Sequence, residues 1–225
     1  MKIAIINGSP RGMNSNSKLI LDQFIAGLEK GKSDVEHETF YLVHRHQTQD
    51  AIDYCLQSDV VLMAFPLYTD AMPGIVKLFF EKMPALPDKK IGYIVQSGFP
   101  EAIHCFYLEK YLGKFTRKLG ATYLGTASKG NVEGIQDRTA WMNKGLYAHF
   151  RNLGFHFAKT GEFDERIIRR LKKPFKLPKV STFFFSLLSS FEISNYGWIW
   201  HLKANHAYEM RHVQPYLITL KKTLM

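Results

Sequence analysis

The sequence predicts an α/β protein: a doubly wound, five-stranded parallel sheet of strand order 2-1-3-4-5, followed by a C-terminal helical extension. Short apolar runs typical of strands alternate along the chain with segments whose apolar residues recur at helical spacing. Strands that alternate with helices form parallel sheets, and 2-1-3-4-5 is a common order for five strands. A sharp rise in positive charge after residue 165 sets the extension apart.

The elements of the first half follow one another in strict alternation. Residues 2–6, KIAII, form a strand because they are apolar and largely β-branched, and Asn7-Gly8-Ser9-Pro10 ends the run. Residues 15–28 form a helix with apolar side chains three and four apart, and 35–42 alternate as a strand does. A short helix over 49–57 precedes 59–65, DVVLMAF, a continuous apolar strand typical of a buried position.

The second half repeats the same pattern. A helix over residues 73–83 opens on proline, which is tolerated in the first helical turn. The apolar run KIGYIVQ, residues 90–96, is a fourth buried strand, and 101–119 form the next helix. Residues 121–127 form the fifth strand and 139–157 the fifth helix.

Charge divides the chain into two parts. The whole chain of 225 residues has a net charge of +10, which by itself suggests nucleic acid or a membrane surface as partner. Residues 1–165, however, have 19 basic and 18 acidic side chains, whereas residues 166–225 have 11 and 2. We therefore predict a nearly neutral sheet domain, residues 1–165, and a basic, aromatic-rich helical extension, residues 166–225.

Cysteine usage and hydropathy predict a cytoplasmic protein. Cys55 and Cys105 are the only cysteines, so there is no disulfide framework and no CxxC pair, as expected in a reducing compartment. The richest apolar run, Val180–Phe191, is shorter than the ~18 residues that a membrane-spanning helix needs.

Three loops are expected to form the site. In a sheet of this order, ligands bind at the carboxyl edge where strand order reverses, between the first and third strands. The loop NGSPRGMNSNS, residues 7–17, is rich in hydroxyls and runs into a helix, whose N-terminus favours a phosphate group. The loop contains neither the GxGxxG motif of dinucleotide-binding loops nor the GK[ST] ending of a Walker A loop, so a mononucleotide suits it better than a dinucleotide. The alternative is an ordinary helix cap that binds no ligand. PLYTDAMPG, residues 66–74, exposes apolar side chains for an aromatic ring or for a neighbouring protein surface.

Together, GSPRGMNSNS (8–17), PLYTDAMPGIVKLFFEK (66–82) and SGFPE (97–101) resemble the NADPH-dependent FMN reductase family of the flavodoxin-like superfamily, over roughly residues 1–160. The resemblance implies three sets of cofactor contacts. The FMN phosphate would be held by Ser9, Arg11, Ser15, Asn16 and Ser17. The isoalloxazine ring would be flanked by Pro66, Leu67, Tyr68, Thr69 and Met72. The other edge of the ring would be closed by Ser97, Gly98 and Phe99.

The resemblance implies an FMN-dependent oxidoreductase. A hydride from NADPH or NADH would pass through FMN to a quinone, azo, nitro or flavin acceptor, and the enzyme would be a homodimer. No acid or base is assigned; Tyr68 either donates a hydrogen bond to an acceptor oxygen or simply packs. Some relatives have an iron–sulfur cluster, but Cys55 alone cannot supply its ligands, and the tail histidines lack metal-ligand spacing, so no metal is predicted. The alternatives are a non-enzymatic FMN electron carrier with a protein partner, and a binding protein that has lost its flavin.

The extension has three interpretations. Its basic start and aromatic stretch, residues 166–191, resemble segments that contact membrane surfaces, where membrane quinones would be reduced. Alternatively, the aromatic side chains pack on the sheet domain or across the dimer, which we favour. Nucleic-acid binding is not predicted, because no recognisable binding motif accompanies the charge.

Overall fold

The computed structural model describes residues 1–32, 34–189 and 195–214. Contacts within the chain divide it into two compact units, Met1–Lys176 and Leu177–Met225. Residues 166–176, which the charge pattern assigns to the extension, are therefore grouped with the sheet.

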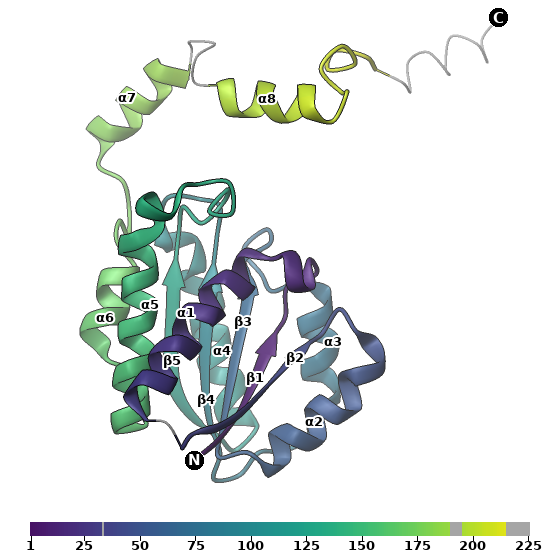
Figure 1. The fold of residues 1–225 in the computed structure, drawn as a ribbon, viewed down its shortest axis with the longest axis vertical. Coiled ribbons are helices and arrows are strands. Elements are labelled where there is room, and N and C mark those ends of the chain that lie inside the picture. Colours follow the sequence, from purple (N-terminus) through teal and green to yellow (C-terminus); the bar gives the residue numbers. More distant parts are fainter. Residues whose placement is uncertain (33, 190–194, 215–225) are drawn as a thin grey trace, which may run out of the picture. The chain divides into compact units, whose positions relative to one another are not determined.

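The first unit is built on one parallel sheet of order β2-β1-β3-β4-β5, as the sequence predicted (Figure 1). All four neighbouring strand pairs are parallel. The strands are β1 (Lys2–Asn7), β2 (Glu36–Tyr41), β3 (Val60–Pro66), β4 (Lys90–Gln96) and β5 (Thr122–Lys129). Strand β3 is buried at every position, which explains its unbroken apolar sequence.

Five helices connect or follow these strands, close to the predicted ranges. They are α1 (Asn16–Gly31), α2 (Thr48–Gln57), α3 (Gly74–Lys82), α4 (Phe106–Lys118) and α5 (Ala140–Thr160). The predicted helix over 101–119 differs at its start, because Ala102–Cys105 is a 3-10 turn that leads into α4.

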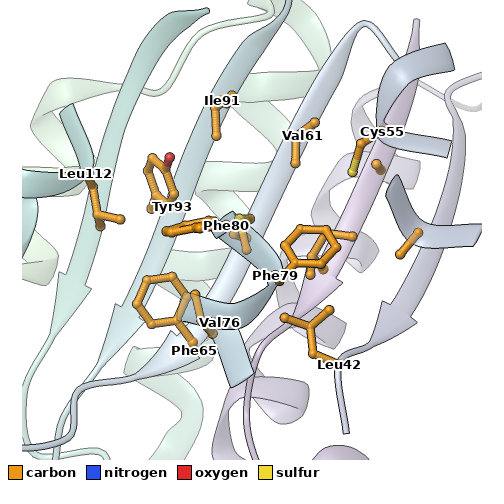
Figure 2. Close-up of a cluster of buried hydrophobic side chains, with 14 of the residues drawn as sticks. Leu42, Cys55, Val61, Phe65, Val76, Phe79, Phe80, Ile91, Tyr93 and Leu112 are labelled. Atoms are coloured by element: carbon orange, nitrogen blue, oxygen red, sulfur yellow. The ribbon is translucent and has the colours of Figure 1, made fainter. Parts of the chain in front are cut away.

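Helices α2, α3 and α4 cover one face of the sheet. Figure 2 shows their core, in which Phe79 and Phe80 of α3 lie over Val61 and Tyr93 of the strands. The hydroxyl of Tyr93 is fully buried but shares a 2.8 Å hydrogen bond with Thr116 Oγ1, so its burial leaves no unpaired polar group.

The two cysteines belong to this same core. Cys55 and Cys105 are unpaired and fully buried, and burial raises the pKa of each thiol to about 12. Neither thiol is therefore a reactive nucleophile at neutral pH.

Helices α1 and α5 cover the opposite face and approach each other closely. The backbones meet at two glycines: a Cβ on Gly27 would lie 1.9 Å from Arg151 O, and a Cβ on Gly154 would lie 2.0 Å from Phe24 O. Only glycine fits at either position. Phe24 and Phe157 fill the space beside this contact, with ring centroids 5.9 Å apart.

Helix α6 (Glu165–Leu171) completes the first unit. It begins at Asp164, whose carboxylate accepts hydrogen bonds from the backbone N–H groups of Arg166 and Ile167 at 2.7 and 3.2 Å. These bonds help to lower the pKa of Asp164. Leu171, 2% exposed, packs into the core beneath α1 and α5. The helix is thus part of the folded sheet unit despite its basic surface.

The second unit contains α7 (Lys179–Ser189) and α8 (Tyr196–Ala204), so the prediction of a helical extension is confirmed. Part of the predicted aromatic stretch, residues 190 and 191, lies outside the described residues. Val180 and Leu187 of α7 and Trp198 of α8 are exposed. Within the described residues, no helix is both long and apolar enough to cross a membrane.

Candidate functional site

The strand order of the sheet reverses between β1 and β3, and we call this place the switch point. These strands are neighbours, although β2 follows β1 in sequence, and Gly8 N donates to Ala64 O at 2.8 Å where the two strands end. The chain then leaves β1 and β3 in opposite directions to reach helices on opposite faces. This divergence opens the space at the carboxyl edge where ligands bind in such folds.

A small pocket of about 60 Å³ occupies this edge. It brings together eight of the thirteen residues predicted from the sequence and two that were not. The predicted lining residues are Ser9, Arg11, Asn16, Pro66, Leu67, Tyr68, Ser97 and Gly98; the two additional ones are Gln96 and Glu133. Three loops distant in sequence thus meet at one point, as the strand order requires.

The loop after β1 is held by its own polar side chains. Asn7 Oδ1 accepts from Ser9 N at 2.9 Å, and Ser9 Oγ accepts from Arg11 N at 3.4 Å. Ser15 is the N-cap of α1: its Oγ accepts from Lys18 N at 3.1 Å and donates to Gly12 O at 2.6 Å. The hydroxyl hydrogen of Ser15 is therefore already used, and this residue serves the helix in the structure.

The first turn of α1 contains two polar atoms without partners. Asn16 Oδ1 and Ser17 Oγ are buried and make no hydrogen bond within the described residues. Leaving such atoms unpaired costs free energy, and unpaired buried groups in native proteins often mark a missing ligand or ion. Ser17 does not line the pocket, but it has a hydroxyl hydrogen to donate. Asn16 Oδ1 only accepts, and Asn16 Nδ2 already donates to Val132 O at 3.0 Å, so the free donors of this turn are Ser17 Oγ and the backbone N–H groups that precede the first hydrogen bonds of the helix. The turn therefore fits an anionic group such as a phosphate.

The loop after β3 folds back on itself in a tight turn. Tyr68 and Ala71 exchange backbone hydrogen bonds at 2.9 and 3.1 Å, with Thr69 and Asp70 at positive φ angles of 48° and 62°. The Tyr68 ring, 47% exposed, is presented at the pocket. Thr69 and Met72 do not line this pocket; Met72 faces a second hollow beside α4.

The loop after β4 supplies the remaining wall. Ser97 is buried, and its Oγ accepts from Phe99 N at 3.0 Å. Phe99 is half exposed and stacks on His104, with ring centroids 4.3 Å apart and the planes inclined by 26°. Its ring does not line the pocket itself but offers a flat apolar face beside it.

Sequence reasoning missed Gln96 and Glu133. Gln96 is the last residue of β4, and Glu133 follows β5; the Glu133 Cβ lies 3.4 Å from the place where a Cβ of Gly98 would stand. The sequence signal was available, because the loop after β5 ends at the same edge as the loops after β1, β3 and β4. Within the described residues, no cluster of three His, Cys, Asp or Glu side chains is placed to hold a metal ion.

This fold defines a doubly wound α/β protein of the flavodoxin type, with a pocket at its switch point. A family model described as flavodoxin-like fold matches residues 1–143, and the chain belongs to that family. None of the curated proteins matches the sequence significantly.

Solved structures with the same fold are similar at low sequence identity. The apo form of the NADH:FMN oxidoreductase EMOB has 18% identity and a TM-score of 0.57, over 77% of this chain and 96% of its own. An NAD(P)H:quinone oxidoreductase from Methanothermobacter marburgensis has 13% identity and a TM-score of 0.57, over 70% and 96%. An FMN-dependent NADH-azoreductase from Bacillus anthracis str. Ames Ancestor, in complex with FMN, has 13% identity and a TM-score of 0.53, over 70% and 99%.

Proposed function

We propose that this protein is an FMN-dependent oxidoreductase that takes a hydride from NADPH or NADH and reduces a small quinone, azo, nitro or flavin acceptor. The observation that carries the proposal is the meeting of three loops in one pocket at the β1/β3 switch point. The family match and the activities for which the similar structures are named support it.

Each loop has its own role in this proposal. Ser9, Arg11, Ser17 and the backbone N–H groups of the first turn of α1, which includes Asn16, bind the phosphate; Ser15 caps that helix and so holds its N-terminus in place. The flavin supplies the hydride chemistry when bound. The residues predicted to flank the ring from the other two loops are Pro66, Leu67, Tyr68, Thr69, Met72, Ser97, Gly98 and Phe99.

The protein contributes binding, orientation and exclusion of water. Leu67 and Tyr68 present an apolar wall, and Tyr68, which is 47% exposed, is also able to donate a hydrogen bond from its hydroxyl to an acceptor oxygen. Glu133 places a carboxylate at the same pocket, so the positive charge of Arg11 has to offset its repulsion of the phosphate. The two buried free thiols agree with the cytoplasmic location that we propose.

Steady-state oxidation of NADPH and NADH with a soluble quinone tests the activity. After loading with FMN, we expect turnover on the order of 1 per second or faster with at least one of the two donors. Bound FMN that is reduced chemically but not by either nicotinamide would contradict the enzyme and favour an electron carrier with a protein partner.

We also propose a homodimer formed through α3 and α4. Leu78, Tyr107 and Tyr111 are 52%, 76% and 48% exposed on these helices. A hollow of about 400 Å³ beside the two tyrosines runs from the loop after β3, at Ala71 and Met72, to α4, so a second subunit here would border the site. Peripheral membrane contact through residues 166–191 stays a prediction.

Replacing Tyr107 by glutamate is expected to convert a dimer into monomers, because the carboxylate would be buried unpaired in the interface. Sedimentation velocity measures the change. Trp141→Glu, at a side chain 77% exposed on α5, is the matched control and should leave the dimer intact. A wild-type monomer with full turnover would refute the proposed interface.

A further inference from the structure

The chain segment that follows α6 runs beside the start of the helix that follows β4. Ala102 N donates to Pro174 O at 3.0 Å, and Ile103 N donates to Phe175 O at 2.9 Å. The first N–H groups of any helix lack partners within it and need acceptors from elsewhere. Here carbonyl groups more than seventy residues further along the chain supply them.

A side-chain bridge fixes the same segment at Lys172. Its ammonium donates to Glu109 Oε2 at 2.5 Å, and the other oxygen of this carboxylate accepts from Ser128 Oγ. The Glu109 and Lys172 side chains are 19% and 25% exposed, and Ser128 is fully buried. The bridge therefore joins α4, β5 and the end of α6 in surroundings partly shielded from water, where ion pairs are stronger than at the surface.

A third contact comes from β5. Lys129 Nζ donates to Lys173 O at 2.8 Å, and burial lowers the pKa of this lysine. Four consecutive residues, Lys172–Phe175, thus each make a hydrogen bond to α4, to β5 or to the turn before α4. We call these four residues the clamp.

The clamp holds the turn on which Phe99 rests. His104, in the clamped turn Ala102–Cys105, stacks on the Phe99 ring. From the other side, Phe99 O accepts from Asn131 N at 2.7 Å. The clamp and the loop after β5 therefore support Phe99 from two sides, next to Ser97 and Gly98 of the pocket.

We propose that the clamp positions the Ser97–Phe99 loop for the flavin ring, with Lys172 and Glu109 as positioning residues. This role rests on the proposed function, since it concerns the same site. In this proposal the first part of the basic extension has a structural role, because Lys172 pairs with Glu109 within the protein and not with an external partner.

The test compares Lys172→Met with wild type in the full-length chain. We expect the Kd for FMN to rise about tenfold, because a loosened loop would have to be ordered when the flavin binds, and we expect the visible circular dichroism of the bound flavin to change. In the apo protein, the amides of Ala102 and Ile103 should exchange hydrogen roughly tenfold faster, because their acceptors are no longer anchored.

Two further variants make the result specific. Lys172→Arg retains the charge and the donors, so it should restore both the flavin affinity and amide protection. Lys176→Met removes the same charge from an exposed side chain just outside the clamp and should match wild type. Faster exchange at Ala102 and Ile103 with unchanged FMN affinity and dichroism would overturn the positioning role, as would unchanged exchange. If wild type itself fails to bind FMN, the proposed function fails and this role with it, whereas the exchange data still report on the clamp.

Discussion

Replacing Arg11 and Ser17 together by alanine is expected to raise the Kd for FMN by about two orders of magnitude, because each loses a hydrogen bond to a charged group worth roughly 1.5 kcal/mol or more. Fluorescence quenching of FMN on titration with the apo protein measures the change. The effect should fall mainly on binding. In the free protein Ser17 Oγ makes no hydrogen bond within the described residues, and the one that Arg11 Nη2 donates to Gln136 Oε1, at 3.0 Å, is exposed to water and contributes little to stability.

Ser15→Ala is the matched control for this variant. Ser15 caps α1, so its loss should lower the free energy of unfolding by about 1 kcal/mol in the apo protein. The double variant should retain the apo stability of wild type in the same urea titration. Flavin affinity unchanged in the double variant would mean that the phosphate binds elsewhere.

Gly154→Ala is expected to lower the free energy of unfolding by about 3 kcal/mol, at the upper end for an overpacked core. A Cβ at this position would lie 2.0 Å from Phe24 O and 3.0 Å from Leu28 N, both backbone atoms that a side-chain rotation cannot move away. Relief therefore requires α1 and α5 to separate. Because α1 begins at the turn that we propose to bind the FMN phosphate, the same variant should also bind FMN more weakly.

Gly145→Ala provides the control within the same helix. No atom lies within 4 Å of a Cβ at this position, so the higher helix propensity of alanine should raise the free energy of unfolding by about 1 kcal/mol. Chemical denaturation followed by circular dichroism distinguishes the two variants. Equal stability of Gly154→Ala and wild type would show that α1 and α5 do not meet as described.

The fold was predictable from the sequence because its signals are local. Unbroken apolar runs such as residues 60–65 mark strands buried on both faces, and their alternation with helices leaves few parallel topologies. The start of the fourth helix was not predictable to the residue. Its first turn, Ala102–Cys105, takes its acceptors from Pro174 and Phe175, a contact invisible to any local pattern.

The site was predictable in part for the same reason. The strand order alone brings the loops after β1, β3 and β4 together, and Ser9, Tyr68 and Gly98 do line one pocket. Glu133 was missed because only three of the loops at that edge were considered. Ser15 caps a helix, whereas the Ser17 hydroxyl is unpaired within the described residues. This difference depends on side-chain geometry, which a run of serines and asparagines does not determine.

Charge was informative only after it was divided along the chain. The excess lies beyond residue 165, but the structure divides that region again. Arg166 and Lys172 belong to the sheet unit, where Lys172 pairs with Glu109, whereas α7 and α8 form the second unit. The first part of a basic segment can therefore belong to the folded sheet unit, and the net charge of the segment does not reveal this.

Binding of FMN to the purified full-length protein tests the central claim most directly. Apo protein titrated into FMN should quench the flavin fluorescence to an end point of one FMN per chain, and denaturation should release intact FMN. A folded protein that leaves FMN fluorescence unchanged at micromolar concentrations, and that carries no flavin when isolated, would contradict the claim that this is a flavoprotein.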